Sequence, residues 1–378
     1  MMSVALHPVD TWFFRDARPY NQHEPWQTDV VSLFPPHPFT VSGALRSLLA
    51  RQAGWDGRTR WPEEIAKVLG RTVEETGEAR FLGGALARNG ETFYPPPLSL
   101  LGLASQDEAG LERFEPRAHL LPGPTCQSDL GIARLPVAPD ATPELRGPAG
   151  FWISAHGLTQ VLAGRLPAPG DFVSQGDLFE LEPRVGIVRD QERRTTCSQE
   201  GSALYSPMHV RLARNVALLT GWSGVPEEWT PAAGQPFPFG GEGRQAILEP
   251  TPMQQPDPPP GGLGPLVALV LVTPTLLPLP PWPGDDLAGC EGVRIISGCL
   301  GPAEKIGGYD SLKRRPVPPQ ACVPAGSVLF CEASEPALAR LKEGISGESP
   351  RVSIGLYTGH GFGQAFLGLW NDEMKEQA

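Results

Sequence analysis

A glycine-rich segment near the C-terminus is the first place where residue types and spacing suggest a binding chemistry. Residues 355–368 hold five glycines in fourteen positions, and Gly359, Gly361 and Gly363 alternate with other residues before a strand-like run. A dinucleotide site would need such a turn to open a helix inside a βαβ unit, whereas only fifteen residues follow Gly363. Two interpretations remain: a tight turn before an edge strand, or a loop whose bare amides approach the phosphates of a nucleic acid.

A basic segment favours the second interpretation. Residues 305–320 are rich in glycine and proline and place Lys305, Lys313, Arg314 and Arg315 against the single acid Asp310. A charge run is usually a solvated face. On a chain with a formal net charge of −11, however, a basic loop suggests an anionic partner.

Two further segments combine arginine with expected turns. Four arginines lie around a hairpin tip expected near residues 189–201: Arg184, Arg189, Arg193 and Arg194. Arginine forks suit phosphate and stack on bases, although nearby acidic residues weaken this signal. The other segment, residues 237–246, places three glycines and Arg244 ahead of another strand.

Catalytic and metal-binding signals are sparse. The sequence has no HExxH, GxSxG or Cys/His nucleophile motif and no CxxC pair. His23 and His37 lie in a proline-rich loop and could act as general bases, while His360 lies inside the glycine-rich segment and could stack on a base. We expect no catalytic residue, no metal and no cofactor; a structural zinc site on the cysteines is the alternative.

Composition sets the remaining limits. The chain has 378 residues with 44 glycines and 44 prolines, which predicts many loops, short strands and few long helices. The acidic balance is a mild point against a nucleic-acid binder, although a binding face can be basic while the rest of the chain is acidic. Neither a secretory signal nor an uninterrupted apolar span is expected, because prolines break the most apolar run after residue 272. The expected location is cytoplasmic.

The order of expected elements predicts the fold class. The split βαβ pattern is followed by a strand over 3–14, a helix over 40–54 capped by Thr40 or Ser42, a hairpin turning at Asn89-Gly90, a helix over 151–164 and three short strands in 177–222. A proline-stiffened linker occupies 249–265, and a similar order with a weak or missing first helix follows it. The prediction is an α+β protein of two tandem ferredoxin-like (RRM-like, βαββαβ) domains. Residues 1–255 form the first, with insertions, and residues 256–378 form the second, with the glycine-rich loop.

Several stretches, in this order, resemble the repeat-associated (RAMP) superfamily, and most closely the third subunit of the type III-B CRISPR (Cmr) effector complex. They are DTWFFRDARPY, TVSGALRSLLA, GIVRDQERRTTCSQEGSALY, GGEGR, GGYDSLKRRPVPPQACVPAGSVLF and GHGFGQAFLGLW. The stretch around 103–150 has no match. The resemblance implies a non-catalytic structural and RNA-binding subunit of an RNA-guided antiviral complex.

The resemblance also implies partners. They are the 5′ tag of the guide RNA (crRNA), the large polymerase-like subunit and a backbone subunit, with neither a membrane nor DNA as a direct partner. The expected RNA-binding residues, from the basic and glycine-rich segments together with the matching motifs, are Arg15, Arg18, Arg193, Arg194, Arg244, Lys313, Arg314, Arg315, Gly359, His360, Gly361 and Gly363.

Two other functions remain open. One is a metal-independent endoribonuclease of the same superfamily that processes precursor crRNA, with His23 or His37 as general base and the glycine-rich loop gripping the substrate. The other is a structural subunit whose loops contact only neighbouring proteins.

Overall fold

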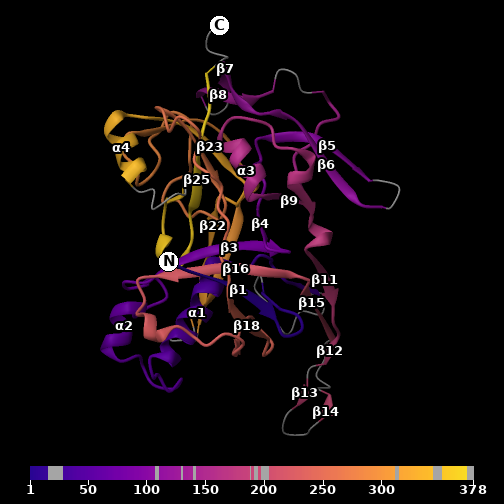
Figure 1. The fold of residues 1–378 in the computed structure, drawn as a ribbon, viewed down its shortest axis with the longest axis vertical. Helices are drawn as coiled ribbons and strands as arrows, with labels where there is room; N and C mark the ends of the chain where they lie inside the picture. The colour runs from indigo at the N-terminus through magenta and orange to yellow at the C-terminus, as the bar shows by residue number, and fades with distance from the viewer. Residues whose placement is uncertain are drawn as a thin grey trace.

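Two antiparallel sheets, with few helices around them, form a mixed α/β protein (Figure 1). The structure is a computed structural model that describes residues 1–15, 29–106, 110–128, 131–138, 142–187, 189–190, 195–196, 204–310, 315–343 and 351–372. The helices are α1 (Pro38–Gln52), α2 (Glu63–Leu69), α3 (Ala155–Leu162) and α4 (Glu335–Glu343), and the 3-10 turns are η1 (Pro169–Asp171), η2 (Gln175–Asp177), η3 (Glu227–Trp229) and η4 (Thr358–His360).

The first sheet has eight strands. In spatial order they are β10 (Phe172–Ser174), β9 (Phe151–Ser154), β4 (Glu91–Tyr94), β3 (Arg80–Arg88), β16 (Val216–Ser223), β1 (Met2–Pro8), β18 (Gln245–Pro250) and β17 (Pro236–Pro238). Helix α1 covers one face, and its Leu45 and Leu49 are fully buried against Leu6 and Leu218 of the sheet core. The second face carries small residues such as Ala5 and Ala85, which leave room for the other half of the molecule.

The expectations for the first helix and for the hairpin lie close to the structure. Helix α1 begins at Pro38, two residues before the expected Thr40 cap, because a proline with its fixed φ suits the first helical position. Gly54 follows the helix with φ 91°, as expected. The hairpin turn is confirmed, with Asn89 at φ 53° and Gly90 at φ 85°.

The expected helix over 151–164 is wrong at its start. Residues Phe151–Ser154 are strand β9, and α3 begins only after Ser154, whose hydroxyl accepts a hydrogen bond from the amide of Gly157 at 3.0 Å. Nor does α3 share the face of the first sheet that α1 covers. Instead it stands between the two sheets, where Gly368 of the second sheet approaches the backbone of Leu162.

Strand β16 lies inside the first sheet although it is far along the chain from the hairpin. It lies between β3 and β1 and is antiparallel to both, which gives the spatial order β18-β1-β16-β3. Its first seven residues are all buried. A strand buried on both faces lies inside a sheet, so the chain returns to the centre of the first sheet after it has formed β4, β9 and β10 at one side.

The second sheet has five strands in the order β20 (Val293–Cys299), β23 (Val328–Ala333), β19 (Leu266–Leu271), β25 (Gln364–Leu369) and β24 (Arg351–Ser353), all antiparallel. Helix α4 lies between β23 and β24 along the chain, and its Ala337 joins the core of this sheet. Between β19 and β20 the chain, all of it described, forms no helix, as the sequence predicts.

The remaining strands build ribbons and a small sheet outside the two main ones. They are β2 (Asp29–Val31), β5 (Leu100–Gln106), β6 (Glu112–His119), β7 (Leu121–Ser128), β8 (Gly131–Val137), β11 (Phe179–Pro183), β12 (Gly186–Ile187), β13 (Arg189–Asp190), β14 (Thr195–Thr196), β15 (Leu204–Leu212), β21 (Glu304–Asp310) and β22 (Arg315–Cys322). Strand β15 pairs with β11 and β12 on one side and with β2, in parallel, on the other.

The proline-rich linker is fastened to the first unit. The Tyr94 hydroxyl donates to the Gln254 carbonyl at 2.7 Å, and the Asp257 amide donates to the Thr159 hydroxyl at 2.9 Å. These bonds, together with α3, hold the two sheets against each other, so side chains from both can meet in one site.

Candidate nucleic-acid interface

The glycine-rich segment lies in the interior, at the junction of the two sheets. Gly361 and Gly363 are buried, with φ values of 97° and 67°. A Cβ on Gly361 would come within 2.7 Å of the Gly83 amide nitrogen, and one on Gly363 would overlap the Ile354 carbonyl. The expectation that this backbone lies against RNA is therefore wrong for both residues, since their missing side chains make room for the chain itself.

His360 has the same internal role. It is only 2 % exposed, its Nδ1 is 2.8 Å from the Ser42 hydroxyl of α1, and Phe39 meets its ring edge-on. Burial, assisted by the charge of Arg46, lowers the pKa of His360 to about 4. Neither stacking on RNA bases nor proton transfer is open to a side chain so enclosed. Gly359 is half-buried against Thr76.

The segment instead supports the root of a ribbon. Phe362 is fully buried and packs with Ile306 of β21 and Cys322 of β22. These two strands carry Lys305 and Arg315 of the basic stretch singled out in the sequence, and Arg315 stands opposite Asp310 in the register. The buried residues 361–363 thus position the β21–β22 ribbon from the interior and present no backbone to a ligand.

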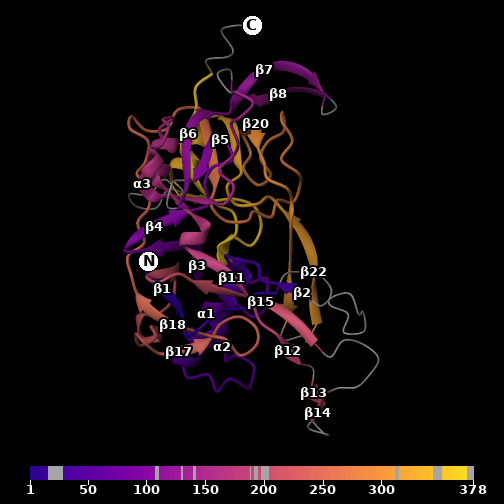
Figure 2. The same ribbon diagram turned by 90° about the vertical axis from the view of Figure 1, so that its right-hand side faces the viewer.

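The other expected contacts divide into two groups. Arg15, Arg244 and Arg315 fall within the described ranges, whereas Arg18, Arg193, Arg194, Lys313 and Arg314 lie outside them. Arg15 forms a bridge with Ser32 beside β2. Figure 2 shows β22 and the β2–β15–β12 sheet extending toward the same side of the molecule. We call this side, defined by β2, β12, β15 and the β21–β22 ribbon, the arginine face.

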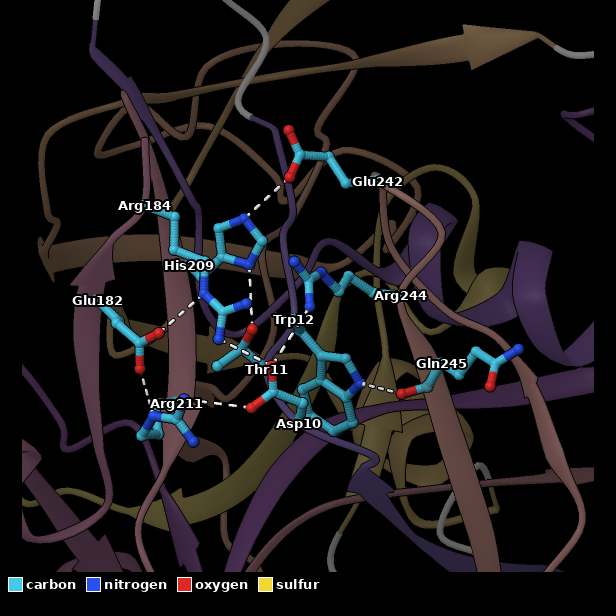
Figure 3. A network of polar contacts seen from close by, with 10 residues as sticks. All are labelled: Asp10, Thr11, Trp12, Glu182, Arg184, His209, Arg211, Glu242, Arg244 and Gln245. Atoms are coloured by element: carbon cyan, nitrogen blue, oxygen red, sulfur yellow. Dashed lines mark hydrogen bonds and ion pairs between the residues drawn. The ribbon is translucent and has the colours of Figure 1, made fainter. Parts of the chain in front are cut away.

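A network centred on Asp10 forms part of this face (Figure 3). Arg184 and Arg211 reach the Asp10 carboxylate with Nη2 at 2.8 Å and 3.2 Å, and Arg244 reaches it with Nη1 at 3.4 Å. Glu182 also accepts hydrogen bonds from the Nε groups of Arg184 and Arg211. The hydrogen bond from Arg184 is the main reason why the pKa of Asp10 lies below its usual value.

Beneath these arginines lies a buried histidine. His209 is fully buried, its ring stacks on Phe13 at 5.3 Å, and its two nitrogens meet the Thr11 hydroxyl at 3.1 Å and the Glu242 carboxylate at 3.0 Å. Burial and the charge of Arg244 lower the pKa of His209. A carboxylate can only accept, so Nε2 of the neutral ring donates to Glu242, and Nδ1 accepts from Thr11.

The glycines ahead of Arg244 serve this packing. A Cβ on Gly240 would come within 2.7 Å of the Phe13 carbonyl, and Gly241 also approaches the Phe13 ring. The indole of Trp12 donates to the Gln245 carbonyl at 3.1 Å. These contacts fix the loop that carries Asp10 to the start of β18, and with it the three guanidinium planes.

The network orients arginines without creating a strong positive charge. The three guanidiniums meet the carboxylates of Asp10 and Glu182, Glu242 adds a third acid beside His209, and the arginine side chains are 22–38 % exposed. Such held, half-exposed forks can donate to phosphate oxygens or stack on unpaired bases. In the described part of the chain, no cluster of three or more His, Cys, Asp or Glu residues could hold a metal ion.

Sequence analysis missed the members that complete this network. Asp10 is the first residue of the DTWFFRDARPY motif but was not among the expected site residues, and Arg211, 201 positions away, lies in none of the motifs. Of the three arginines, Arg184 and Arg244 stood in segments that the sequence had singled out, and Arg211 did not.

The family profile of "CRISPR-associated protein (Cas_Cmr3)" matches residues 4–370, which is almost the whole chain. The chain belongs to the Cas_Cmr3 family. This membership confirms the resemblance to a Cmr subunit that the sequence motifs indicate. It also covers the stretch around 103–150, which in the structure of this Cas_Cmr3 chain forms β5 to β8.

Chains in several solved structures are similar to the Cas_Cmr3 chain over most of its length. One, in the cryo-EM structure of the type III-B Cmr-beta bound to cognate target RNA, has a TM-score of 0.49 and 16 % identity and covers 91 % of this chain and 90 % of that chain. Another, in the crystal structure of the Csm3-Csm4 subcomplex in the type III-A CRISPR-Cas interference complex, has a TM-score of 0.38 and 9 % identity over 98 % and 100 % of the two chains. At these identities no residue role is transferred.

No curated protein matches the sequence significantly. Within the described ranges, no helix is long and apolar enough to cross a bilayer.

Proposed function

We propose that the chain is a non-catalytic, RNA-binding subunit of a type III-B CRISPR effector complex. In this proposal it helps hold the 5′ tag of the crRNA, beside the large polymerase-like subunit and next to a backbone subunit. The observation that carries the proposal is the arginine face, where Arg184, Arg211 and Arg244 converge on Asp10 within a Cas_Cmr3 chain.

The chemistry of the face suits a short single strand. Guanidiniums held by carboxylates lose little side-chain freedom when they bind, and their planar forks match phosphate and base faces. The balanced charge keeps non-specific attraction low, so a fixed short tag is a better ligand than long RNA. Arg15 and the β21–β22 ribbon extend toward the same side and would add contacts to the strand.

We also propose that the two sheets are tandem ferredoxin-like domains, divided near residues 255 and 256. The support is strand order: β18-β1-β16-β3 in the first sheet and β25-β19-β23-β20 in the second are antiparallel throughout. Numbered within each unit, both orders read 4-1-3-2, with the first strand between the fourth and the third. The first unit keeps the helix after its first strand, and the second keeps only the later one.

Buried histidines favour a non-catalytic subunit over the endoribonuclease alternative. His37 is 9 % exposed, neither of its ring nitrogens has a hydrogen-bond partner within the described ranges, and burial lowers its pKa to about 4. A general base has to reach the proton that it abstracts, and a group this enclosed does not. The alternative then depends on His23, which lies outside the described residues. Metal-independent cutting of precursor crRNA that His23→Ala abolishes would establish it.

Binding of a 5′-tag RNA to the chain, measured across a range of salt concentrations, tests the proposed function. Arg211→Ala should weaken binding about tenfold and reduce the salt slope by about one, as expected for the loss of one phosphate contact. Arg211→Lys keeps the charge but not the fork and should restore only part of the affinity. Arg60→Ala, at an exposed arginine outside the face, is the matched control. Unchanged affinity and slope for Arg211→Ala would assign the face to protein contacts.

A further inference from the structure

A second cationic site lies away from the arginine face. A cavity of about 490 Å³ opens between the first sheet and the second, lined on one side by Arg80 and Leu82 and on the other by Cys290, Arg340 and Arg351. The N-terminus and α4, which also contribute to its wall, lie on the left in Figure 1, whereas β12 and β15 lie on the right.

The cavity is more basic than the chain as a whole. Its wall holds three arginines and one acidic residue, Glu291. None of the three guanidiniums pairs with a carboxylate in the part of the chain that the structure describes. On a chain with a formal net charge of −11, arginines without acidic partners gathered at one cavity favour an anionic ligand.

Two of these arginines use only one of their guanidinium nitrogens in hydrogen bonds to the described residues. Arg80 uses Nη1 on the carbonyls of Gly77 and Ala79, at 2.7 Å and 2.8 Å. Arg340 uses Nη2 on the Glu291 carbonyl at 2.6 Å. The other N–H groups of both forks make no hydrogen bond within the described ranges. Both side chains are exposed, so these groups can reach a ligand in the cavity.

The third arginine adds charge from inside the wall. Arg351 lies over the Phe366 ring at 5.2 Å, and its Nε and Nη1 are buried without a hydrogen-bond partner among the described residues. A buried guanidinium with no carboxylate beside it is costly unless an anion approaches. Its field adds to that of Arg80 and Arg340 even where it makes no direct contact.

The rest of the wall is apolar. Leu82, Val293, Val352 and Ile354 all contribute to it. The cavity volume lies within the range of small-molecule sites, and it exceeds what a phosphate ion alone would fill. We propose that this cavity binds a nucleoside phosphate, with the phosphate between Arg80 and Arg340 and the base against the apolar wall.

Cys290 supplies a reporter inside the cavity. Its thiol is half-buried and lines the cavity together with Arg340, and burial raises its pKa while the charge of Arg340 opposes that shift. Cys126 is exposed on β7 and lines no part of this cavity. Alkylation of the full chain, followed site by site by mass spectrometry, therefore measures occupancy at Cys290 against an internal standard.

With 5′-AMP at about ten times its dissociation constant, alkylation of Cys290 should slow about tenfold while Cys126 is unaffected. Adenosine should give no protection, and inorganic phosphate should give less than AMP. Arg80→Ala and Arg340→Ala should each weaken AMP binding about tenfold or more, whereas Arg60→Ala should leave it unchanged. The ratio of rates with and without AMP is compared within each variant, because Arg340 also alters the reactivity of the thiol.

Three results would overturn the proposal. The first is no protection by AMP. The second is equal protection by adenosine, or by an acidic peptide of aspartates, which would assign the cavity to a base or to a protein partner. The third is protection that survives both Arg80→Ala and Arg340→Ala. None of these outcomes bears on tag binding at the arginine face, so the two proposals stand or fall separately.

Discussion

The buried glycines give the sharpest test of how the two sheets are joined. Replacing Gly361 by alanine places a Cβ 2.7 Å from the Gly83 nitrogen, at a φ of 97°. Gly284 has the same φ of 97°, and a Cβ there would meet nothing within 4 Å, so Gly284→Ala carries the backbone strain without the clash. The pair Gly363 and Gly243 repeats the comparison at a φ of 67°.

The expected magnitudes follow from this comparison. The left-handed conformation costs an alanine about 1–2 kcal/mol in variant and control alike. Overpacking against backbone that cannot move adds about 1–3 kcal/mol in Gly361→Ala. For Gly363→Ala the overpacking cost should be at or above the upper end of this range, because its Cβ overlaps the Ile354 carbonyl.

Urea unfolding followed by tryptophan fluorescence measures the difference between each variant and its φ-matched control. Tag-RNA binding is measured on the same samples under native conditions. We expect both glycine variants to unfold at lower urea than their controls, and folded Gly361→Ala to keep its RNA affinity. If Gly361→Ala is as stable as Gly284→Ala but loses RNA, the glycine contacts the ligand and the packing argument is refuted.

Two further predictions concern stability. Because burial lowers the pKa values of His37 and His360 from 6.5 to about 4, the folded state binds fewer protons than the unfolded state. Their contribution, up to about 3 kcal/mol each, is complete above pH 6.5 and is lost as the pH falls toward 4, so His360→Gln should flatten the pH profile of unfolding; an unchanged slope in this window would contradict that reasoning. Arg134 and Asp372 form a two-pronged ion pair at 2.5 Å and 2.9 Å, with side chains only 14 % and 15 % exposed. A double-mutant cycle on Arg134→Met and Asp372→Asn should give a coupling energy of about 0.5–3 kcal/mol, and a value near zero would mean that the pair is screened like a surface one.

Local sequence patterns predicted many single elements correctly. Helix α1 lies within two residues of its expected bounds, since one face of leucines and the stop at Gly54 are local signals. The Asn89-Gly90 turn depends only on two residues that tolerate positive φ. The strands and helix of the second sheet also appear where apolar runs and caps indicate them. In each case the deciding interaction spans a few residues.

The sequence was a poorer guide to how those elements pair and pack. Strands were expected in the stretch that contains β16, but nothing local indicated which neighbours β16 would have. An apolar run such as that of β16 indicates that the strand is buried, but it does not indicate which strands will pair with it. Its place between β3 and β1 follows from which edges remain unpaired once the whole chain has folded.

The sequence alone determined the family, the mixed α/β class and the segments in which cations and glycines gather, because these depend on residue identity and short-range order. Only the tertiary structure decided what each segment does. It buried Gly361 and His360 between the sheets, where Ser42, 318 positions away, meets the histidine. It also brought Arg211 to Asp10 across 201 positions. Pairings at such separations are set by the packing of whole sheets, and no local pattern encodes which distant partner a side chain will meet.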